Sequence, residues 1–468
     1  MLGSEVAPFA KSGGLADVLG ALPIALAQRG VEVAVLLPLY RSIPKEQLRL
    51  VYSDLPVVLG KDTYRASIYL QELRDVRFFF LDIPAFYDRS GLYFENDQDY
   101  PDNFLRFAAL NVAGFALIRS LFRAEILHCH DWQAGLAPYL LRRRFHVDPT
   151  FACVRSVFTI HNLAYQGIFG RDVLPRIGLA DTAFSSGDIE FYGNVSYLKA
   201  GIAFADAITT VSPTYAKEIQ MPEAGWGLDG LLHSRSEHLH GILNGADYSI
   251  WDPASDPFIA ANYDAKKLDG KKLCKADLLR EMGLDAEALK DKPLVGIVAR
   301  LSVQKGFDLI AAVADELMAQ DLTLVVLGSG ERRYEEVFDY LAGRYPDRVA
   351  FRAGYSEPLA HKIEAGADLF LMPSQYEPCG LNQIYSLRYG TVPIVRAVGG
   401  LDDTVSEETG FKFSGYSGRE MLIAINEALK AFENKRTWKK RMLAGMSRDY
   451  SWASSADEFL ALYQSLVL

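Results

Sequence analysis

Residues 294–327 read LVGIVARLSVQKGFDLIAAVADELMAQDLTLVVL, and this stretch decides the fold class. The apolar run from Leu294 to Val298 predicts a buried strand, and the pattern from Phe307 to Gln320 predicts a helix. Leu322 to Leu327 predicts a second buried strand. A strand, a helix and a strand in this order are typical of a parallel sheet that is covered by helices.

The same alternation continues in both directions along the chain. It predicts a helix from Glu331 to Tyr345 and another from about Gly380. Near the start of the chain it predicts a helical face, although Pro23 within this pattern argues against an unbroken helix. That face consists of Leu15, Val18, Leu19, Leu22 and Leu26. Further predicted strands are Val31–Pro38, Phe78–Ile83, Ile126–His128, Val154–Ile160, Ala207–Val211, Val349–Ala353, Leu369–Met372 and Val392–Val395. We therefore expect an α/β protein of two Rossmann-like, doubly wound domains with mainly parallel sheets.

Turn-rich sequences between the two halves predict a domain boundary. Asn244-Gly245-Ala246-Asp247 and Trp251-Asp252-Pro253 have the composition of a hinge. We expect one domain at residues 1–245 and a second domain at residues 246–450. Only Met1 to Ser4 precede the first glycine loop, so we expect the first strand of the N-terminal domain to be shortened.

Composition argues against several classes of partner. The 468 residues carry a formal net charge of −10, and half of them are hydrophobic. An acidic chain does not suit nucleic acid or an anionic membrane, because both require a basic surface. A neutral polysaccharide remains a suitable partner.

Targeting signals and cysteine usage indicate the compartment. No apolar run is long enough to span a bilayer, and the N-terminus has no apolar segment typical of a signal peptide. The four cysteines (Cys129, Cys153, Cys274 and Cys379) are scattered, which favours free thiols in a reducing environment. We expect a cytoplasmic protein.

Two glycine-marked loops carry the first chemical signal. Lys11-Ser12-Gly13-Gly14-Leu15 opens into a helical pattern, and Glu377-Pro378-Cys379-Gly380-Leu381 follows an apolar strand. The free N–H groups at the start of a helix suit phosphate, Lys11 could add an ammonium group, and Gly13 and Gly14 would allow close approach. A turn with a solvated lysine explains the first loop equally well. One loop in each half suggests two domains that face each other across a deep cleft.

Arg300 and Lys305 follow the strand that ends at Val298. The carboxyl ends of parallel strands are the edge where open α/β sheets bind ligands. Two cations at this edge could neutralise a diphosphate leaving group without a metal. The alternative is a pair of surface residues in salt bridges, and the position favours the functional interpretation.

Three more side chains lie at predicted strand ends. Glu377 could face a sugar ring, although an acid at a helix start can also simply stabilise the helix dipole. Tyr355 could stack on a base, although most tyrosines at such places only pack. His161, which Asn162 follows, ends a strand at the same kind of edge, although a single histidine is more often structural than catalytic.

Two short motifs raise the question of a metal. His128 and His130 share a strand face, but no further ligand has a suitable spacing, so we do not expect a closed zinc site. Asp97-Gln98-Asp99 resembles a metal-binding DxD sequence, but no strand precedes it, and an exposed acidic loop is the better interpretation. We expect neither a metal nor another cofactor.

The chain as a whole resembles bacterial glycogen synthases and plant starch synthases. The resemblance runs from Lys11-Ser12-Gly13-Gly14-Leu15 to Tyr450-Ser451-Trp452. Other matching motifs are His130–Leu136, Thr159–Gly167, Lys199–Gly201, Val211–Tyr215, Leu243–Asp247, Arg300-Leu301, Gln304–Gly306, Glu377–Leu381 and Gly399–Leu401. It implies a GT-B fold and the transfer of glucose from ADP-glucose to the non-reducing end of an α-1,4-glucan (glycogen or starch), with retention of configuration. It also implies an acceptor-side N-terminal domain, a C-terminal domain that binds the nucleotide sugar, and a helix at residues 451–468 that returns to the first domain.

The resemblance also assigns roles to individual residues. It implies that Lys11, Arg300 and Lys305 bind the diphosphate, and that Tyr355 stacks on adenine. His161 and Glu377 would bracket the transferred glucose. The other implied substrate-binding residues are Gly13, Gly14, Tyr93 (toward the acceptor), Asp131, Asn162, Asn244, Cys379, Gly380 and Leu381.

Our mechanistic hypothesis is that closure of the domains brings Lys11 against Arg300 and Lys305 and excludes water. Whether Glu377 acts as a nucleophile or only stabilises positive charge stays open. One alternative is a related glucosyltransferase that uses UDP-glucose or another acceptor. Another is a non-catalytic glucan-binding protein, which the presence of Lys11, Lys305 and Glu377 argues against.

Overall fold

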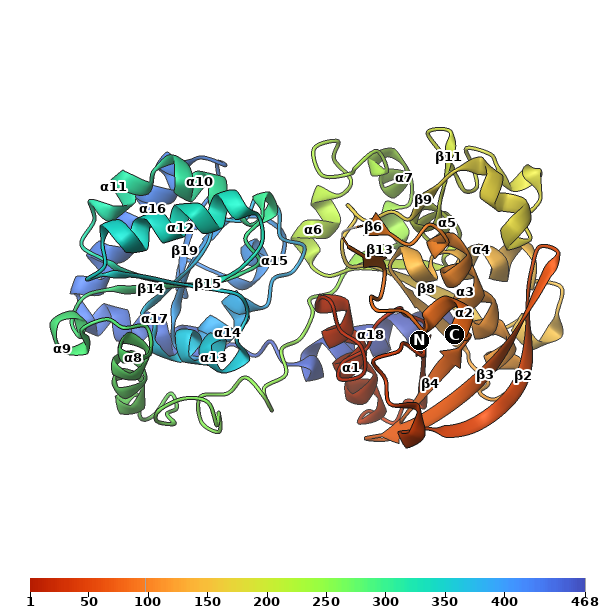
Figure 1. The fold of residues 1–468 in the computed structure, drawn as a ribbon, viewed down its shortest axis with the longest axis horizontal. Helices are drawn as coiled ribbons and strands as arrows, with labels where there is room; N and C mark the ends of the chain where they lie inside the picture. The colour runs from red at the N-terminus through yellow and green to blue at the C-terminus, as the bar shows by residue number, and fades with distance from the viewer. Residues whose placement is uncertain (97, 468) are drawn as a thin grey trace. The chain divides into compact units, whose positions relative to one another are not determined.

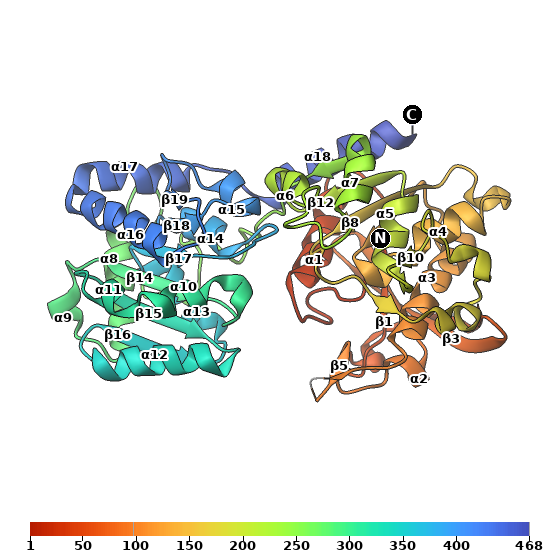
Figure 2. The ribbon, with the colours of Figure 1, turned by 90° about the horizontal axis from the view of Figure 1, so that it is seen from above.

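The computed structural model describes residues 1–96 and 98–467, which form two compact units, each with its own sheet and core (Figure 1, Figure 2). Among the described residues, no helix is both long and apolar enough to cross a membrane. Unit 1 comprises Met1–Val211, Ala216–Gly245 and Trp452–Leu468, and unit 2 comprises Ser212–Tyr215 and Ala246–Ser451.

Unit 2 is built on six parallel strands. They are β14 (Leu294–Val298), β15 (Thr323–Gly328), β16 (Val349–Ala353), β17 (Leu369–Met372), β18 (Val392–Arg396) and β19 (Phe411–Phe413). Their order in the sheet is β16-β15-β14-β17-β18-β19. Counted along the chain this is 3-2-1-4-5-6, the order of the Rossmann fold, with its switch point between β14 and β17.

Helices cover both faces of this sheet. Figure 1 shows α10, α12 and α16 on one face and α8 and α13 on the other. A separate buried apolar cluster lies under each layer, one around Phe338 and Ile425 and the other around Leu278 and Ile363. The predicted doubly wound arrangement of this half is confirmed. The helices are α8 (Asp269–Glu281), α9 (Ala286–Leu289), α10 (Phe307–Ala312), α11 (Ala314–Met318), α12 (Arg332–Arg344), α13 (Glu357–Gly366), α14 (Asn382–Arg388), α15 (Gly399–Thr404), α16 (Gly418–Glu433) and α17 (Lys435–Met446).

One predicted helix of this unit is interrupted. The sequence predicts a single helix from Phe307 to Gln320, but Val313 separates α10 from α11, with φ −126° and ψ 26°. Valine is a weak helix former because its branched side chain is restricted. A Cβ atom on Gly418 would lie 2.5 Å from Val313 Cγ1, so Val313 packs directly on the start of α16. We attribute the break to this packing, which the local pattern does not reveal.

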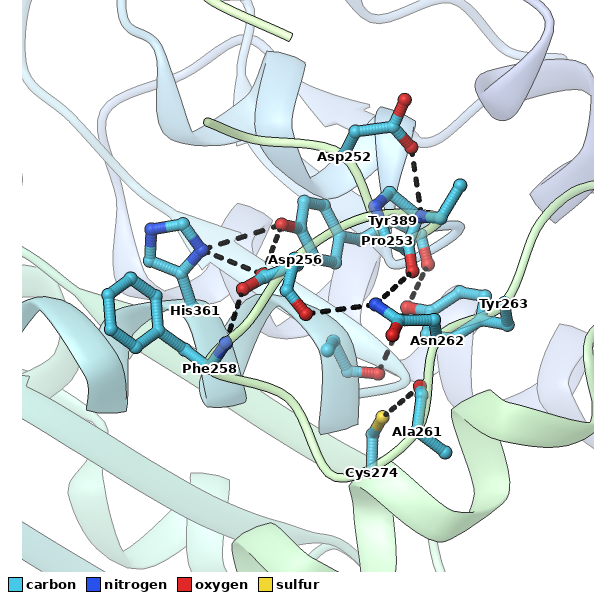
Figure 3. A network of polar contacts seen from close by, with 12 residues as sticks. Asp252, Pro253, Asp256, Phe258, Ala261, Asn262, Tyr263, Cys274, His361 and Tyr389 are labelled. Carbon is cyan, nitrogen blue, oxygen red and sulfur yellow. Dashed lines mark hydrogen bonds and ion pairs between the residues drawn. The ribbon is translucent and has the colours of Figure 1, made fainter. Parts of the chain in front are cut away.

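A buried polar network fastens the first segment of unit 2 to its helices (Figure 3). The Asp256 carboxylate accepts hydrogen bonds from His361 Nδ1 at 2.7 Å, from the Tyr389 hydroxyl at 2.5 Å and from Phe258 N at 2.8 Å. The side chains of Asp256 and His361 are fully buried. Burial alone raises the pKa of the Asp256 carboxyl, but the hydrogen bonds from His361 and Tyr389 lower it more, so the pKa lies below its ordinary value.

Aromatic stacking holds the same segment. The Trp251 indole lies between the rings of His361 and Tyr385, at centroid distances of 3.7 Å and 4.1 Å. Farther along, the Tyr263 hydroxyl donates to the Tyr389 carbonyl oxygen at 2.8 Å. The chain from Trp251 to Tyr263 is therefore docked on α13 and α14, although its first residues have the composition of a hinge.

Unit 1 contains two four-stranded arrangements, with orders β1-β4-β3-β2 and β13-β12-β8-β7. The second is parallel throughout, as the sequence predicts. In the first, β2 and β3 pair antiparallel, and so do β3 and β4, so the prediction of parallel strands misses a hairpin there. Two smaller antiparallel sheets, β10-β11-β9 and β5-β6, complete the strands of unit 1. The strands are β1 (Val33–Pro38), β2 (Arg49–Leu59), β3 (Asp62–Leu73), β4 (Val76–Asp82), β5 (Phe94–Glu95), β6 (Gln98–Asp99), β7 (Ile126–His130), β8 (Arg155–Ile160), β9 (Ile168–Phe169), β10 (Glu190–Phe191), β11 (Asn194–Ser196), β12 (Ala207–Thr210) and β13 (Leu239–Gly241).

A short segment at Leu2 joins the two arrangements. Leu2 forms isolated parallel bridges to Leu36 of β1 and to Cys129 of β7. Its N–H donates to the His128 carbonyl at 2.8 Å, and its carbonyl accepts from His130 N at 3.0 Å. The segment therefore occupies the position of a central strand but is shorter than a strand, as we expect from the few residues before the glycine loop.

The helices of unit 1 include one that tolerates an internal proline. α1 continues through Pro23, the residue that argued against an unbroken helix, and it buries Leu22 and Leu26 on one face. The C-terminal helix α18 packs on α1 and belongs to unit 1. The helices are α1 (Gly14–Ala27), α2 (Pro84–Tyr87), α3 (Asn103–Ser120), α4 (Leu136–Arg143), α5 (Tyr197–Phe204), α7 (Asp229–Ser234) and α18 (Trp452–Val467), and residues of α6 (Pro213–Glu218) are assigned to both units.

Candidate active site

The first glycine loop lies at the N-terminus of α1 in unit 1. Gly13 precedes the helix in an extended conformation and provides no side-chain cap. A Cβ atom on Gly13 or Gly14 would meet nothing within 4 Å, so the loop has open space beside its backbone. The Lys11 ammonium is half exposed and lies 2.6 Å from Asp17 Oδ1. The loop has the open space and the nearby cation that we predict for a phosphate site, but the N–H groups of Ser12 and Gly13 donate to Glu5.

A buried carboxylate orders this loop. Glu5 Oε2 accepts hydrogen bonds from the N–H groups of Ser12 at 2.5 Å and Gly13 at 3.1 Å. Glu5 Oε1 accepts from the Ser12 hydroxyl at 3.0 Å and from the Tyr93 hydroxyl at 2.8 Å. Glu5 is only 4% exposed. The Tyr93 hydroxyl, another residue of the predicted site, is thus bonded to the residue that holds the Lys11 loop.

His161 follows β8, and two groups from the neighbouring end of β7 fix its position. His161 Nε2 lies 3.0 Å from His130 Nδ1. The backbone N–H of His161 donates to Asp131 Oδ1 at 2.8 Å, and the N–H of Asn162 also bonds to this carboxyl. The structure therefore brings the predicted residues Asp131, His161 and Asn162 together at the carboxyl edge of the sheet, because β7 and β8 are adjacent parallel strands.

Burial controls the protonation of these groups. It lowers the pKa of His161 to about 3 and lowers the pKa of His130 well below its usual range, so both imidazoles are neutral near pH 7. Burial raises the pKa of the Asp131 carboxyl to about 7, partly offset by the two N–H donors. The charge of Glu5 raises the pKa of Asp131 further, which couples the Lys11 loop electrostatically to the His161 cluster.

Asp131 also has an unusual backbone, with φ 55° and ψ −176°. This region is sparsely populated by residues other than glycine, and such strain occurs often at functional sites. The conformation turns the chain from β7 into the short helix at Trp132–Ala134.

His128 and His130, which the sequence analysis considers as zinc ligands, form hydrogen bonds with other side chains. His128 Nδ1 lies 2.6 Å from the Tyr463 hydroxyl, and His128 Nε2 lies 2.5 Å from Thr159 Oγ1. Within residues 1–96 and 98–467, no group of three or more His, Cys, Asp or Glu side chains could hold a metal ion. In the DxD sequence, Asp97 lies outside the described residues, and Asp99 is exposed in β6.

In unit 2, Lys305 and Glu377 meet at the switch point of the sheet. Lys305 follows β14 and Glu377 follows β17, and the Lys305 ammonium lies 2.5 Å from Glu377 Oε2. Ser374 Oγ donates to the same oxygen at 3.0 Å. Gly306 has φ 75°, and a Cβ atom there would lie 1.9 Å from the Pro373 carbonyl oxygen. Glycine is therefore needed for the two loops to approach closely enough to form the ion pair.

Three other residues of the predicted site each lie in a loop that follows a strand. Arg300 is exposed just after β14, and within the described part of the chain its guanidinium has no ion-pair partner. Tyr355 follows β16 and is 74% exposed. Asn244 is half-buried in the loop after β13, at the end of the second segment of unit 1.

The remaining predicted residues form the turn after Glu377. Cys379 is buried, and Leu381 occupies the N-cap position of α14 without a side-chain hydrogen bond to the helix. The side-chain amide of Gln383 donates to the carbonyl oxygens of Cys379 at 3.0 Å and Gly380 at 3.1 Å. This turn is therefore held rigidly by the helix that it precedes.

Three residues that organise these clusters were not predicted from the sequence. They are Glu5, Ser374 and His130, which was considered as a zinc ligand but not as a partner of His161. His130 could have been found, since it ends a strand beside the one that leads to His161. Glu5 and Ser374 carry no such signal, because only the tertiary structure brings their oxygens to the loops.

Comparisons with known proteins cover nearly the whole chain. A family model described as the starch synthase catalytic domain matches residues 1–234, and one described as glycosyl transferases group 1 matches residues 285–442. A glycogen synthase from Anaeromyxobacter dehalogenans is 50% identical over 477 residues, covering 99% of this chain and 98% of its own length. A glycogen synthase from Koribacter versatilis is 50% identical over 470 residues, covering 98% of this chain and 96% of its own.

Solved structures give the same relationship. The catalytic domain of starch synthase IV from Arabidopsis thaliana, bound to ADP and acarbose, has a TM-score of 0.89 and 32% identity, covering 99% of this chain and 98% of that one. Sucrose-phosphate synthase from Thermosynechococcus elongatus has a TM-score of 0.61 and 19% identity, covering 100% of this chain and 96% of that one, and shows the fold alone.

Proposed function

We infer the function from the family, because the chain belongs to the glycogen and starch synthases and is a glycosyltransferase with the GT-B fold. We propose that it transfers glucose from ADP-glucose to the non-reducing end of an α-1,4-glucan, with retention of the anomeric configuration. The family and fold class that the motifs predict are confirmed. A cytoplasmic location remains a prediction.

The ion pair of Lys305 and Glu377 is the observation that carries the proposal. A cation and a buried carboxylate 2.5 Å apart at the switch point of a Rossmann-like sheet supply both charges that the reaction needs. We propose that the Lys305 ammonium, together with Arg300, takes up the charge of the departing diphosphate. The Glu377 carboxylate then faces the positive charge that develops on the transferred glucose.

The bond changes are those of a retaining transfer. The acceptor 4-hydroxyl attacks C1 of the glucose from the face that the diphosphate leaves. The bond from C1 to the phosphate oxygen breaks, the bond from C1 to the acceptor O4 forms, and the hydroxyl proton passes to the leaving phosphate oxygen. ADP and a glucan that is longer by one glucose residue are the products.

The other proposed contacts divide between the two units. In unit 1, we propose that Lys11 and the backbone at Gly13 and Gly14 bind phosphate, and that neutral His161 contacts the glucose. Asp131, Asn162, Asn244 and Tyr93 complete the proposed sugar contacts there. In unit 2, we propose that Tyr355 stacks on adenine and that Cys379, Gly380 and Leu381 contact the donor sugar.

A labelled-donor assay tests the proposal. ADP-glucose and UDP-glucose, each labelled in the glucose, are incubated with the full chain and glycogen, with and without a chelator. We expect label in the polymer from ADP-glucose, and release of that label by an α-1,4-specific glucosidase. Transfer from UDP-glucose alone would overturn the donor assignment, and no transfer from either would overturn the function. A strict metal requirement would return attention to Asp97 and Asp99.

A further inference from the structure

His130 is a buried histidine that has no role in the reaction as derived so far. It is the last residue of β7, and the adjacent parallel strand β8 leads directly to His161. His130 Nδ1 lies 3.0 Å from His161 Nε2, and the two rings are inclined by only 25°. One of these two nitrogens donates the proton of this hydrogen bond. The direction of the bond therefore decides which nitrogen of His161 carries a proton.

Only two arrangements of protons form this bond. Burial keeps both imidazoles neutral, since it lowers the pKa of His161 to about 3 and the pKa of His130 well below its usual range. A neutral imidazole has one N–H group and one unprotonated nitrogen. If His130 Nδ1–H donates to His161 Nε2, His161 keeps its own proton on Nδ1. If His161 Nε2–H donates instead, His130 keeps its proton on Nε2.

The two nitrogens outside the bond differ in what can reach them. Within the described residues, neither His130 Nε2 nor His161 Nδ1 has a hydrogen-bond partner. His130 is 0% exposed, whereas His161 is half-buried at the carboxyl edge of the sheet, where ligands bind.

This difference in access selects one arrangement. A buried N–H group without an acceptor is costly and rare, and no ligand can relieve it at the fully buried His130. At His161, by contrast, a bound sugar can supply the acceptor. The bond therefore runs from His130 Nδ1–H to His161 Nε2, and the free N–H group belongs to His161.

His128 holds the ring of His130 in place. The centroids of these two rings are 4.0 Å apart. His128 is itself fixed at both nitrogens, because Nδ1 lies 2.6 Å from the Tyr463 hydroxyl of α18 and Nε2 lies 2.5 Å from Thr159 Oγ1. His130 cannot turn without displacing a ring that two hydrogen bonds hold. The bond to His161 therefore keeps one geometry.

We propose that His130 is a positioning residue that holds His161 in its Nδ1–H tautomer, so that His161 Nδ1 donates a hydrogen bond to a hydroxyl oxygen of the transferred glucose. A hydrogen bond to one ring nitrogen of a histidine commonly sets which nitrogen carries the proton, as in the outer partners of metal-bound histidines. This inference rests on the proposed function, because it refines the contact of His161 with the sugar.

The protonation of the two rings can be measured in the full enzyme without substrate. With ¹⁵N-labelled histidine, two-bond correlation spectra distinguish protonated from unprotonated ring nitrogens. The signals are assigned by their loss in His130→Asn and His161→Ala. We expect both rings to be protonated at Nδ1 and unprotonated at Nε2. A His161 ring protonated at Nε2 overturns the inference. Since this measurement needs no activity, it separates failure of the inference from failure of the proposed function.

Kinetics test whether the bond matters for transfer. His130→Leu removes the donor, and we expect kcat/KM for ADP-glucose to fall about ten-fold, the loss of about one hydrogen bond. His130→Asn can place an amide N–H near the position of Nδ1, and it is expected to restore most of the loss. In a His161→Ala background, His130→Leu is expected to cost nothing further, because its effect passes through His161. Equal losses in His130→Leu and His130→Asn, or independent losses in the double variant, overturn the inference.

His240→Leu is the matched control, because His240 is half-buried in β13, at the opposite end of the strand order β13-β12-β8-β7. It is expected to leave kcat/KM unchanged. Thermal unfolding shows whether each variant is folded. Should His130→Leu fail to fold, the tautomer of His161 in the unmodified enzyme decides the question, with a proton on Nδ1 supporting the inference and a proton on Nε2 overturning it.

Discussion

The Lys305 ammonium and the Glu377 carboxylate are paired at 2.5 Å, with the Glu377 side chain 7% exposed and that of Lys305 22% exposed. The buried acid and the more accessible cation lie at the ends of two neighbouring strands, β14 and β17. In this arrangement the cation can turn toward a phosphate while the carboxylate remains in place. In the proposed reaction, the pair links binding of the leaving diphosphate to the carboxylate that faces the sugar.

The first prediction is that Lys305→Ala impairs turnover far more than folding. Removing one preorganised charge that stabilises a transition state costs about 10²- to 10³-fold in kcat. Steady-state kinetics and thermal unfolding of the same preparations measure the two effects. Lys362→Ala is the control, because Lys362 is equally buried and ion-paired with Asp277 in unit 2. Turnover like that of the unmodified enzyme in Lys305→Ala would refute the leaving-group role.

The second prediction concerns the carboxylate that orders the Lys11 loop. Glu5→Gln replaces one of the two carboxylate oxygens with an NH₂ group, which cannot accept. The groups of Ser12, Gly13 or Tyr93 that donate to that oxygen therefore lose their acceptor. We expect a loss of about 1–3 kcal/mol in the free energy of unfolding and a higher KM for ADP-glucose. Tyr93→Phe removes only one hydroxyl and is expected to have a smaller effect on both. A Glu5→Gln variant with unchanged KM would show that the loop does not depend on Glu5 for donor binding.

The third prediction is a pH dependence that belongs to Asp131. The pKa of its carboxyl is about 4 in the unfolded chain and about 7 in the folded one, so between these values only the folded state holds the proton. Stability from this group therefore falls as pH rises from about 4 to about 7. His161, with its pKa lowered to about 3, acts in the opposite direction, since the unfolded chain takes up the proton below about 6.5 and stability falls as pH falls.

Asp131→Asn separates the two contributions. The variant cannot ionise at this position, so its free energy of unfolding relative to the unmodified chain should increase as pH rises from about 4 to about 7. Urea denaturation at several pH values across this range measures the difference, in which the contribution of His161 cancels to a first approximation. A difference that does not vary with pH would mean that Asp131 is already ionised throughout the range.

The sequence predicts the elements whose pattern is local. Leu294–Val298, Val349–Ala353 and Leu369–Met372 are predicted with their true bounds, because each is a short apolar run between turns. The antiparallel pair β2 and β3 was missed, although β3 alternates between buried and less buried residues along much of its length. Alternation of this kind is weak when polar residues also occupy the half-buried face.

The site residues likewise divide into those that a local pattern predicts and those that only the tertiary structure reveals. Residues at strand ends, such as Lys305, Glu377 and His161, could be proposed from the edge rule for parallel sheets. The bond from Glu5 to the Lys11 loop and the packing of the Tyr192 ring beside Gly227 could not, because both depend on contacts that only the tertiary structure makes. The sequence indicates which side chains lie at the carboxyl edge of the sheet, but not which oxygen atom or aromatic ring contacts them there.

The last prediction concerns the segment that docks on α13 and α14. Asp256→Ala leaves His361 Nδ1 and the Tyr389 hydroxyl buried without their acceptor. Each unsatisfied donor costs about 1–3 kcal/mol, so we expect a loss of about 3 kcal/mol in the free energy of unfolding. Hydrogen exchange measured by mass spectrometry should locate the change, with faster exchange across residues 251–263.

Asp252→Ala is the matched control for this variant. Asp252 lies in the same segment and pairs with Arg388, but both side chains are partly exposed, at 18% and 30%. A partly exposed ion pair contributes less than a buried network, so the control is expected to lose about 1 kcal/mol or less. Equal losses in Asp252→Ala and Asp256→Ala, or unchanged exchange across the segment in Asp256→Ala, would mean that stacking of Trp251 rather than the polar network holds the segment on unit 2.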